Sequence, residues 1–202
     1  MATKRSSTGH GTGSSPPDAM TGFLFTFIAV LLAGIGARDQ ITVATLAARI
    51  GQRPALLALA IALSLATAAF AAWVSLEIAP MLNSRARGLF AAIALGLGGL
   101  ESLLLSPGRK PEEPTRSLAA TGLVLLAHQL TDASRFLIFG LAVATGAALP
   151  AGAGGAIAGA IMLGAAWAAP ELFEWQRLKP VRRGTGGLLV LTAIVVGYRA
   201  LA

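Results

Sequence analysis

The chain has 202 residues, of which 55% are hydrophobic and 12% are charged, and its mean hydropathy is +0.72. Because soluble domains usually carry about 25% charged residues, this composition excludes an ordinary soluble domain and predicts a multi-pass protein of the lipid bilayer. The lack of cysteine excludes a disulfide framework, a thiolate metal site and a cysteine nucleophile.

The net charge of +7 raises the question of nucleic-acid binding. The basic residues fall in short segments between apolar runs, however, and no aromatic residues are interleaved with them. Contact with anionic lipid headgroups explains this distribution better. We therefore expect basic loops at the membrane surface and no nucleic-acid partner.

Residues 1–19 are rich in serine, glycine and threonine and predict a disordered polar tail. The apolar segment 20–48 is longer than a bilayer requires at about 1.5 Å per helical residue, so a long, tilted or broken helix is expected there. Two further spans are predicted at 54–76 and 88–105. Glu101 lies near the end of the third span, where its side chain would reach the headgroups.

A charged connection at 106–116 separates this half of the chain from a second one. There the fourth span covers 117–147, a turn is expected at 149–152, and the fifth helix covers about 154–169. Small residues spaced four apart in the fifth helix would let neighbouring backbones approach closely. A short sixth span is expected at 184–198. The segment before it is a basic connection that holds Arg177, Lys179, Arg182 and Arg183.

The sequence thus predicts an all-α membrane protein with six transmembrane helices. Three helices per half is an odd number, so the second half must insert upside down, which gives two inverted three-helix repeats at 20–105 and 117–202. The loop charges place both termini outside the cytoplasm. Short loops and Ala- and Gly-rich helices are typical of a prokaryotic inner membrane. The sequence leaves open whether the chain forms a homo-oligomer.

Each half contains a polar block inside its first apolar segment, at 34–40 and at 129–135. Ionisable side chains at this depth are costly and are tolerated mainly when they face a bundle interior or a water-filled path. The blocks together hold two arginines and two aspartates, which predicts that Arg38 pairs with Asp132 and that Asp132 contacts Arg135 on one helix. Such a set of charges either holds the two halves together or lines an ion path.

Residues 40–49 and 134–142 continue the two blocks with mostly apolar sequence. In this context the blocks resemble the family of Golgi-type manganese and calcium transporters and their bacterial relatives, six-helix proteins that carry Glu-x-Gly-Asp-Lys-(Ser/Thr)-Gln once per half. The motifs are eroded here. The matching residues are Gly36, Gln40, Asp132 and Ser134. The substituted ones are Gly34 and Gln129 for Glu, Thr131 for Gly, Ala37 for Asp, Arg38 and Ala133 for Lys, Asp39 for the hydroxyl residue and Arg135 for Gln.

The resemblance implies an ion pathway along the two blocks, with Asp39 and Asp132 as the metal ligands. His128, beside the second block, is either a proton carrier on this pathway or a histidine that packs between helices. The residues of the expected pathway are Gly34, Gly36, Arg38, Asp39, Gln40, His128, Gln129, Thr131, Asp132, Ser134 and Arg135.

The function that the resemblance implies is transport of a divalent cation, manganese or calcium, in exchange for protons, in a divergent form. Only one of the family's four motif acids remains, and Arg38 and Arg135 add two permanent positive charges that repel a dication, so we expect weak manganese binding. The alternative is a transport-inactive relative that serves as a membrane scaffold or partner subunit. An enzyme is not expected, because the sequence has no nucleophile–base pair, no metal-ligand cluster and no glycine-rich phosphate loop. No resident cofactor is expected either.

Overall fold

The computed structural model describes residues 16–104 and 117–202, and these parts contain helices and no strand. Residues 1–15 of the predicted tail and the predicted connection at 106–116 lie outside the described residues. The prediction that the tail extends to residue 19 is wrong, because helix α1 (Pro16–Gly34) already begins at Pro16. Proline favours the first turn of a helix, where its missing N–H is not needed.

The first apolar segment forms a broken helix, which is one of the alternatives expected from the sequence. Helix α1 ends at Gly34, helix α2 (Arg38–Ile50) begins three residues later, and the two axes differ by 57°. Helix α3 (Pro54–Ile78) matches the expected second span, and a 3-10 turn (Ala79–Met81) follows it. Helix α4 (Ser84–Leu104) begins four residues earlier than the predicted third span, so the arginines before that span belong to its first turn.

The second half is broken in the same way, into α5 (Leu118–Leu130) and α6 (Ala133–Thr145). The turn expected at 149–152 is wrong: the chain turns at Gly146, whose φ of 65° ends α6, and α7 (Ala148–Ala168) starts at once. Pro150 is tolerated because it lies in the first turn of α7.

After a 3-10 turn (Pro170–Phe173), the last helix, α8 (Trp175–Leu201), is much longer than the span predicted at 184–198. The supposed basic connection forms its first turns, including Pro180. A long arginine or lysine side chain can sit in a helix near a membrane end, where its stem packs on apolar surface and its charge reaches water. The charges therefore did not mark a loop.

Four helices of the described residues are long and apolar enough to cross a membrane. They are Pro54–Met81, Ser84–Leu104, Ala148–Ala168 and Gln176–Leu201, and the bent pair α1–α2 makes up to five. Helices α5 and α6 have 13 residues each and are too short to span singly. These lengths and compositions support an integral membrane protein.

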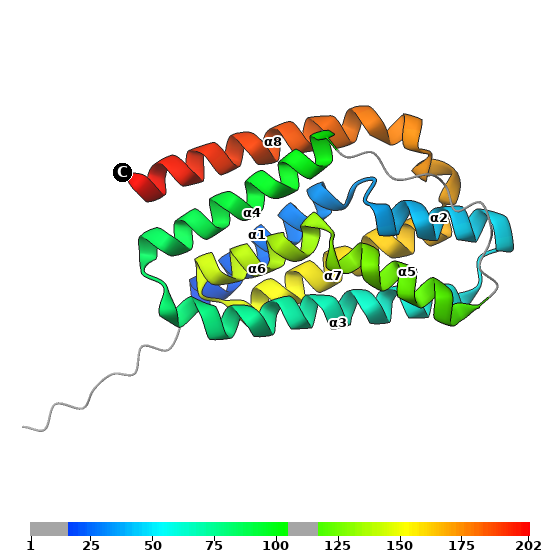
Figure 1. Cartoon of the computed structure of the whole chain (residues 1–202), viewed down its shortest axis with the longest axis horizontal. Helices are drawn as coiled ribbons and strands as arrows, with labels where there is room; N and C mark the ends of the chain where they lie inside the picture. Colours follow the sequence, from blue (N-terminus) through cyan, green and yellow to red (C-terminus); the bar gives the residue numbers. More distant parts are fainter. Residues whose placement is uncertain (1–15, 105–116) are drawn as a thin grey trace, which may run out of the picture.

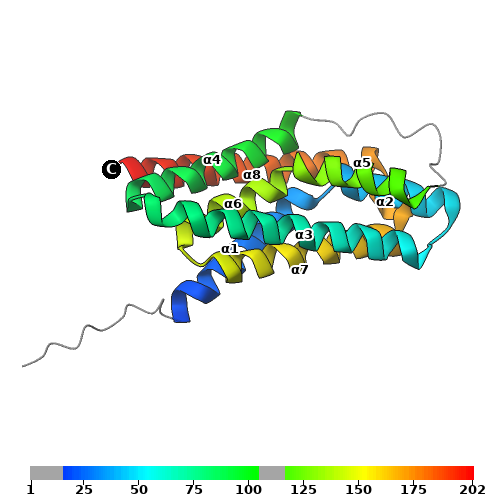
Figure 2. The same cartoon turned by 60° about the horizontal axis from the view of Figure 1, so that its bottom comes forward.

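The helices lie roughly along one axis (Figure 1), and turning the molecule shows α4 and α8 beside each other on one side of it (Figure 2). The α4–α8 contact is the most extensive in the structure, followed by those of α1 with α7 and of α4 with α6. In Figure 1 α1 and α2 run from left to right, whereas α5 and α6 run from right to left. The two broken helices are therefore antiparallel.

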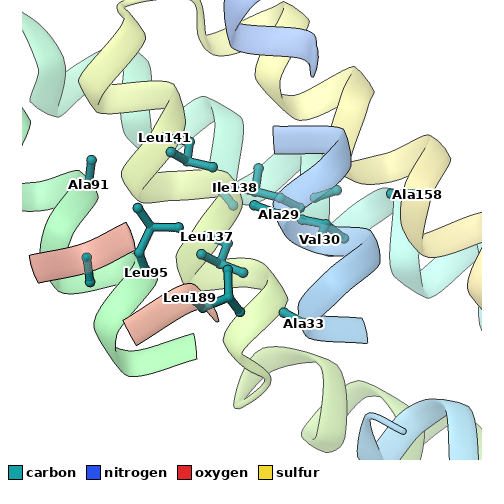
Figure 3. Close-up of a cluster of buried hydrophobic side chains, with 13 residues drawn as sticks. Ala29, Val30, Ala33, Ala91, Leu95, Leu137, Ile138, Leu141, Ala158 and Leu189 are labelled. Atoms are coloured by element: carbon teal, nitrogen blue, oxygen red, sulfur yellow. The ribbon is translucent and has the colours of Figure 1, made fainter. Parts of the chain in front are cut away.

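The main apolar core lies where α1, α3, α4, α6, α7 and α8 meet (Figure 3). Leu137 and Ile138 of α6 are fully buried at its centre. Small residues allow the helices to approach closely: a Cβ on Gly154 would collide with the backbone oxygen of Phe23, and one on Gly155 with Ile138. The expected packing role of small residues in this helix is thereby confirmed for Gly155 and also holds for Gly159, whereas a Cβ at Gly164 would have no neighbour within 4 Å.

Candidate functional site

The first helix break is built around Gly36, which has a φ of 70°. The left-handed region favours glycine because it lacks a Cβ. The Gly36 N–H donates to Oε1 of Gln40 at 2.7 Å, and the Ala37 N–H donates to the Gly34 carbonyl at 3.0 Å. Gln40 is 1% exposed and also donates from Nε2 to the carbonyl of Met162 on α7, at 3.2 Å. Gln40 thus ties the break to the second half of the chain.

The second break lies at Thr131 and Asp132. The extended backbone of Asp132 (φ −82°, ψ 141°) ends the helical path of α5 and starts α6. The first N–H of α6, that of Ala133, donates to Oε2 of Glu101 on α4 at 2.8 Å. An acidic side chain at a helix N-terminus satisfies a free donor and complements the positive end of the helix dipole.

A small cavity of about 20 Å³ lies between the two breaks. This volume holds about one water molecule or one ion of similar size. Its charged and polar lining comes from both breaks, since Asp39 and Gln40 begin α2 whereas Asp132, Ser134 and Arg135 begin α6. The remaining lining residues are Val30, Gly34, Ala37, Gly159, Met162 and Leu163.

Arg135 is 7% exposed and only partly satisfied. Its Nη2 donates to Oγ of Ser64 on α3 at 3.0 Å, whereas its Nε and Nη1 have no hydrogen-bond partner among the described residues. Gln129 is fully buried, and its Nε2 donates to the carbonyl of Ala60, also on α3, at 3.3 Å. Both residues of the second half therefore bond to the first half.

Not all of the expected pathway residues reach the cavity. Gly34, Asp39, Gln40, Asp132, Ser134 and Arg135 line it, and Gln129 is buried against α3 near them. Arg38 is half-buried, and Thr131 is exposed, donating to the carbonyl of Ala127 at 2.9 Å. His128 is half-buried with its Nδ1 3.3 Å from the Thr42 hydroxyl of α2, as a packing histidine would be.

The predicted ion pairs are wrong. Neither Arg38 nor Arg135 lies within 4.0 Å of an acidic side chain in the described parts of the chain, where the ion pairs are Glu101–Arg182 and Glu174–Arg177. Asp132 lies before α6 on extended backbone, so the side-by-side geometry of residues three apart in a helix does not apply to Asp132 and Arg135.

The pair Glu101–Arg182 is the feature that the sequence interpretation missed. Glu101 was placed at the headgroups and Arg182 in a loop, yet Arg182 is 2% exposed and its Nη1 donates to the Ile35 carbonyl in the first break at 3.4 Å. The available signal was the isolated acid in the apolar run of α4, since an ionisable residue within a span indicates function by default.

The cavity brings two carboxylates and one guanidinium together. Asp39 and Asp132 bring two negative charges and Arg135 one positive charge, so the lining carries a net charge of −1 when all three are ionised. In the described residues no group of three or more His, Asp or Glu side chains is arranged to hold a metal ion. A single small cation with weak coordination fits this lining better than a tightly held dication.

Comparisons with family models, curated proteins and solved structures find no match to this chain.

Proposed function

We propose that this chain is a transporter that carries a small cation across a membrane in exchange for protons. The observation that carries the proposal is the central cavity, where the starts of two half-helices from different parts of the chain bring Asp39, Asp132 and Arg135 together inside an apolar bundle. Ionisable groups at this depth are costly, and broken helices with binding groups at the midplane are the usual architecture of secondary transporters.

We further propose six spans in two inverted repeats, with α5 and α6 together forming the fourth span. Helices α2 and α6 have 13 residues each and start at positions 38 and 133, which are 95 apart. Gly51 and Gly146, also 95 apart, follow them with positive φ angles. The opposite directions of the two broken helices support the inversion (Figure 1). Alternating access would then rock one half against the other around the cavity.

The contacts of equivalent residues support the same arrangement. Gln40 and Arg135 occupy the same position in the two blocks, and each donates to a long helix of the other half, Gln40 to α7 and Arg135 to α3. A movement between the halves would change both contacts together. Two interlocked repeats are expected to make such reciprocal contacts, each with a helix of the other repeat.

The resemblance to the Golgi-type transporters makes manganese and calcium the first ions to test. Asp39 and Asp132 would be the ligands, because hard cations prefer carboxylate oxygens. Arg135 lines the same cavity and repels a dication, so weak binding of manganese is part of the proposal.

The transport experiment uses the purified protein in proteoliposomes that contain a pH-sensitive dye. Manganese or calcium uptake driven by an outward proton gradient, with matching proton movement, is expected. Asp39→Asn and Asp132→Asn should each abolish the exchange, whereas Glu77→Gln, at an exposed acid of α3, should leave it intact. Absence of ion-coupled proton movement for every mono- and divalent cation tested would refute the proposal.

That refuting outcome would favour the second candidate, a transport-inactive membrane scaffold or partner subunit. The observation that favours it is Arg135, which projects a permanent charge into a cavity with room for about one water. A chain of this kind would keep the buried charges for the packing of its halves alone.

We propose a prokaryotic inner membrane as the location, with the basic end of the bundle in the cytoplasm. Exposed basic residues gather near the end where α2 finishes and α8 begins, and there they would contact anionic lipids. These residues are Arg49, Arg53, Arg177, Lys179 and Arg183.

A further inference from the structure

We propose that Glu101 and Arg182 couple the two helix breaks, so that a change at one break is transmitted to the other. Glu101 Oε2 accepts the N–H of Ala133 at the start of α6, and Arg182 Nη1 donates to the Ile35 carbonyl between α1 and α2. The two charged groups face each other, with Arg182 Nη2 3.8 Å from Glu101 Oε1. One continuous path of polar contacts therefore joins the breaks.

Both ends of this path are next to the cavity. Ala133 follows Asp132, and Ile35 follows Gly34, and both Asp132 and Gly34 line the cavity. A shift of either break thus moves a lining residue directly. The role of this coupling in transport rests on the proposed function. In that case, an ion that binds at Asp132 of the second break would also change the first break.

The pair is buried but incompletely bonded, which suits a contact that forms and breaks. The side chains of Arg182 and Glu101 are 3% and 11% exposed. Even so, Nε of Arg182 and Oε1 of Glu101 have no hydrogen-bond partner among the described residues. Such a pair contributes little to stability, because the desolvation of two incompletely bonded charges can exceed their attraction.

Helices α4 and α8 form the support that carries the pair. Their backbones are in close contact near it, because a Cβ added to Gly99 would lie 2.7 Å from the Gly186 carbonyl. Gly99 is two residues from Glu101, and Gly186 is one turn from Arg182. The two helices therefore hold Glu101 and Arg182 opposite each other, and the contact between the two charged groups, at 3.8 Å, is longer than the contacts that each makes to a break, at 2.8 and 3.4 Å.

The test uses the absence of native cysteine, which leaves a single introduced thiol as the only reactive one. Ala37→Cys reports on the first break and Ser134→Cys on the second, and both positions are buried, at 2% and 4% exposure. The rate of thiol labelling by a small water-soluble reagent is measured for each position in the native background, in Glu101→Gln, in Arg182→Gln and in the double variant. Arg183→Gln, at the exposed neighbour, is the matched control.

Coupling predicts that each single variant raises labelling at both positions, by about 5- to 150-fold, the range of typical coupling between sites. The double variant should then be no faster than the faster single variant. The proposal is overturned if Glu101→Gln affects only position 134 and Arg182→Gln affects only position 37, or if both variants affect one position and their effects multiply in the double variant.

Two further arms keep the result interpretable. If the glutamine variants do not fold, as judged by gel filtration, Glu101→Asp and Arg182→Lys replace them, because they keep the charge while shortening or reshaping the contact.

In proteoliposomes the variants of Glu101 and Arg182 should lose exchange. Their cation affinity should stay within about threefold of that of the native protein, which is less than the smallest typical coupling between sites. If the native protein transports nothing, the proposed function fails, and the labelling rates still decide whether the breaks are coupled.

Discussion

Replacement of Gly159 by alanine tests whether the buried guanidinium of Arg135 depends on its hydrogen bond to Ser64. A Cβ at Gly159 would lie 2.7 Å from Oγ of Ser64, the acceptor of Arg135 Nη2. The serine would have to turn away, and the buried charge would lose its hydrogen bond. Gly164→Ala on the same helix is the matched control, since no atom lies within 4 Å of its added Cβ.

The expected change in the free energy of unfolding follows from two opposing effects. Alanine stabilises a helix interior by about 1 kcal/mol relative to glycine, and both variants gain this. A hydrogen bond to a charged group contributes about 1.5–3 kcal/mol, and only Gly159→Ala loses it. The free energy of unfolding of Gly159→Ala should therefore fall about 1.5–3 kcal/mol below that of Gly164→Ala, because the helix term cancels between them.

Equilibrium unfolding in detergent, followed by circular dichroism, measures this difference. In a Ser64→Ala background the obstructing oxygen is gone, so Gly159→Ala should behave like Gly164→Ala. Equal stabilities of the two glycine variants in the native background would refute the reasoning, because they would mean that the contact of Ser64 with Arg135 does not constrain α7.

Three other outcomes are expected. Gly99→Ala should destabilise the protein by about 1–3 kcal/mol in thermal unfolding, because its Cβ would overlap α8, whereas Gly96→Ala on the same helix, whose Cβ would have its nearest neighbour at 3.7 Å, should not. Gly146→Ala should cost about 1–2 kcal/mol in the same assay, because its φ of 65° is unfavourable for a residue with a Cβ; no loss would show that the turn adjusts freely. Cysteines introduced at Gln52 and Met81, exposed residues flanking α3, should label from opposite sides of the membrane with an impermeant reagent, and labelling from one side would contradict a spanning α3.

The sequence was most informative where the signal was local. The uninterrupted apolar run of α3 predicted a span, and a broken helix was one of the alternatives expected for the first apolar segment, where Gly36 explains the break by its positive φ. The start of α8 could not be predicted in this way, because arginines and lysines near a membrane end occur in helices and in loops alike. Composition alone therefore misplaced that boundary.

Charge pairing was the part of the site that depended on three-dimensional information. Counting charges in the two blocks gave a neutral set and a pairing of Arg38 with Asp132, but Glu101 and Arg182 lie far from those blocks in the sequence and enter the same region through α4 and α8. Which charges meet is decided by helix packing, and nothing in the spacing of the blocks encodes the register of α4 against α8.

The long contact between α4 and α8 has a consequence for biosynthesis. Helix α8 leaves the ribosome after all the other α-helices of the described structure. Helix α4 therefore enters the membrane before α8, which packs against its glycines and supplies Arg182 to Glu101, has been made. Until α8 inserts, the Glu101 carboxylate is without its cationic neighbour, a condition that a hydrocarbon environment penalises. Assembly of the described bundle therefore waits for α8, and a nascent chain that stalls before it would expose an incomplete, acid-bearing surface to the insertion machinery and to proteases.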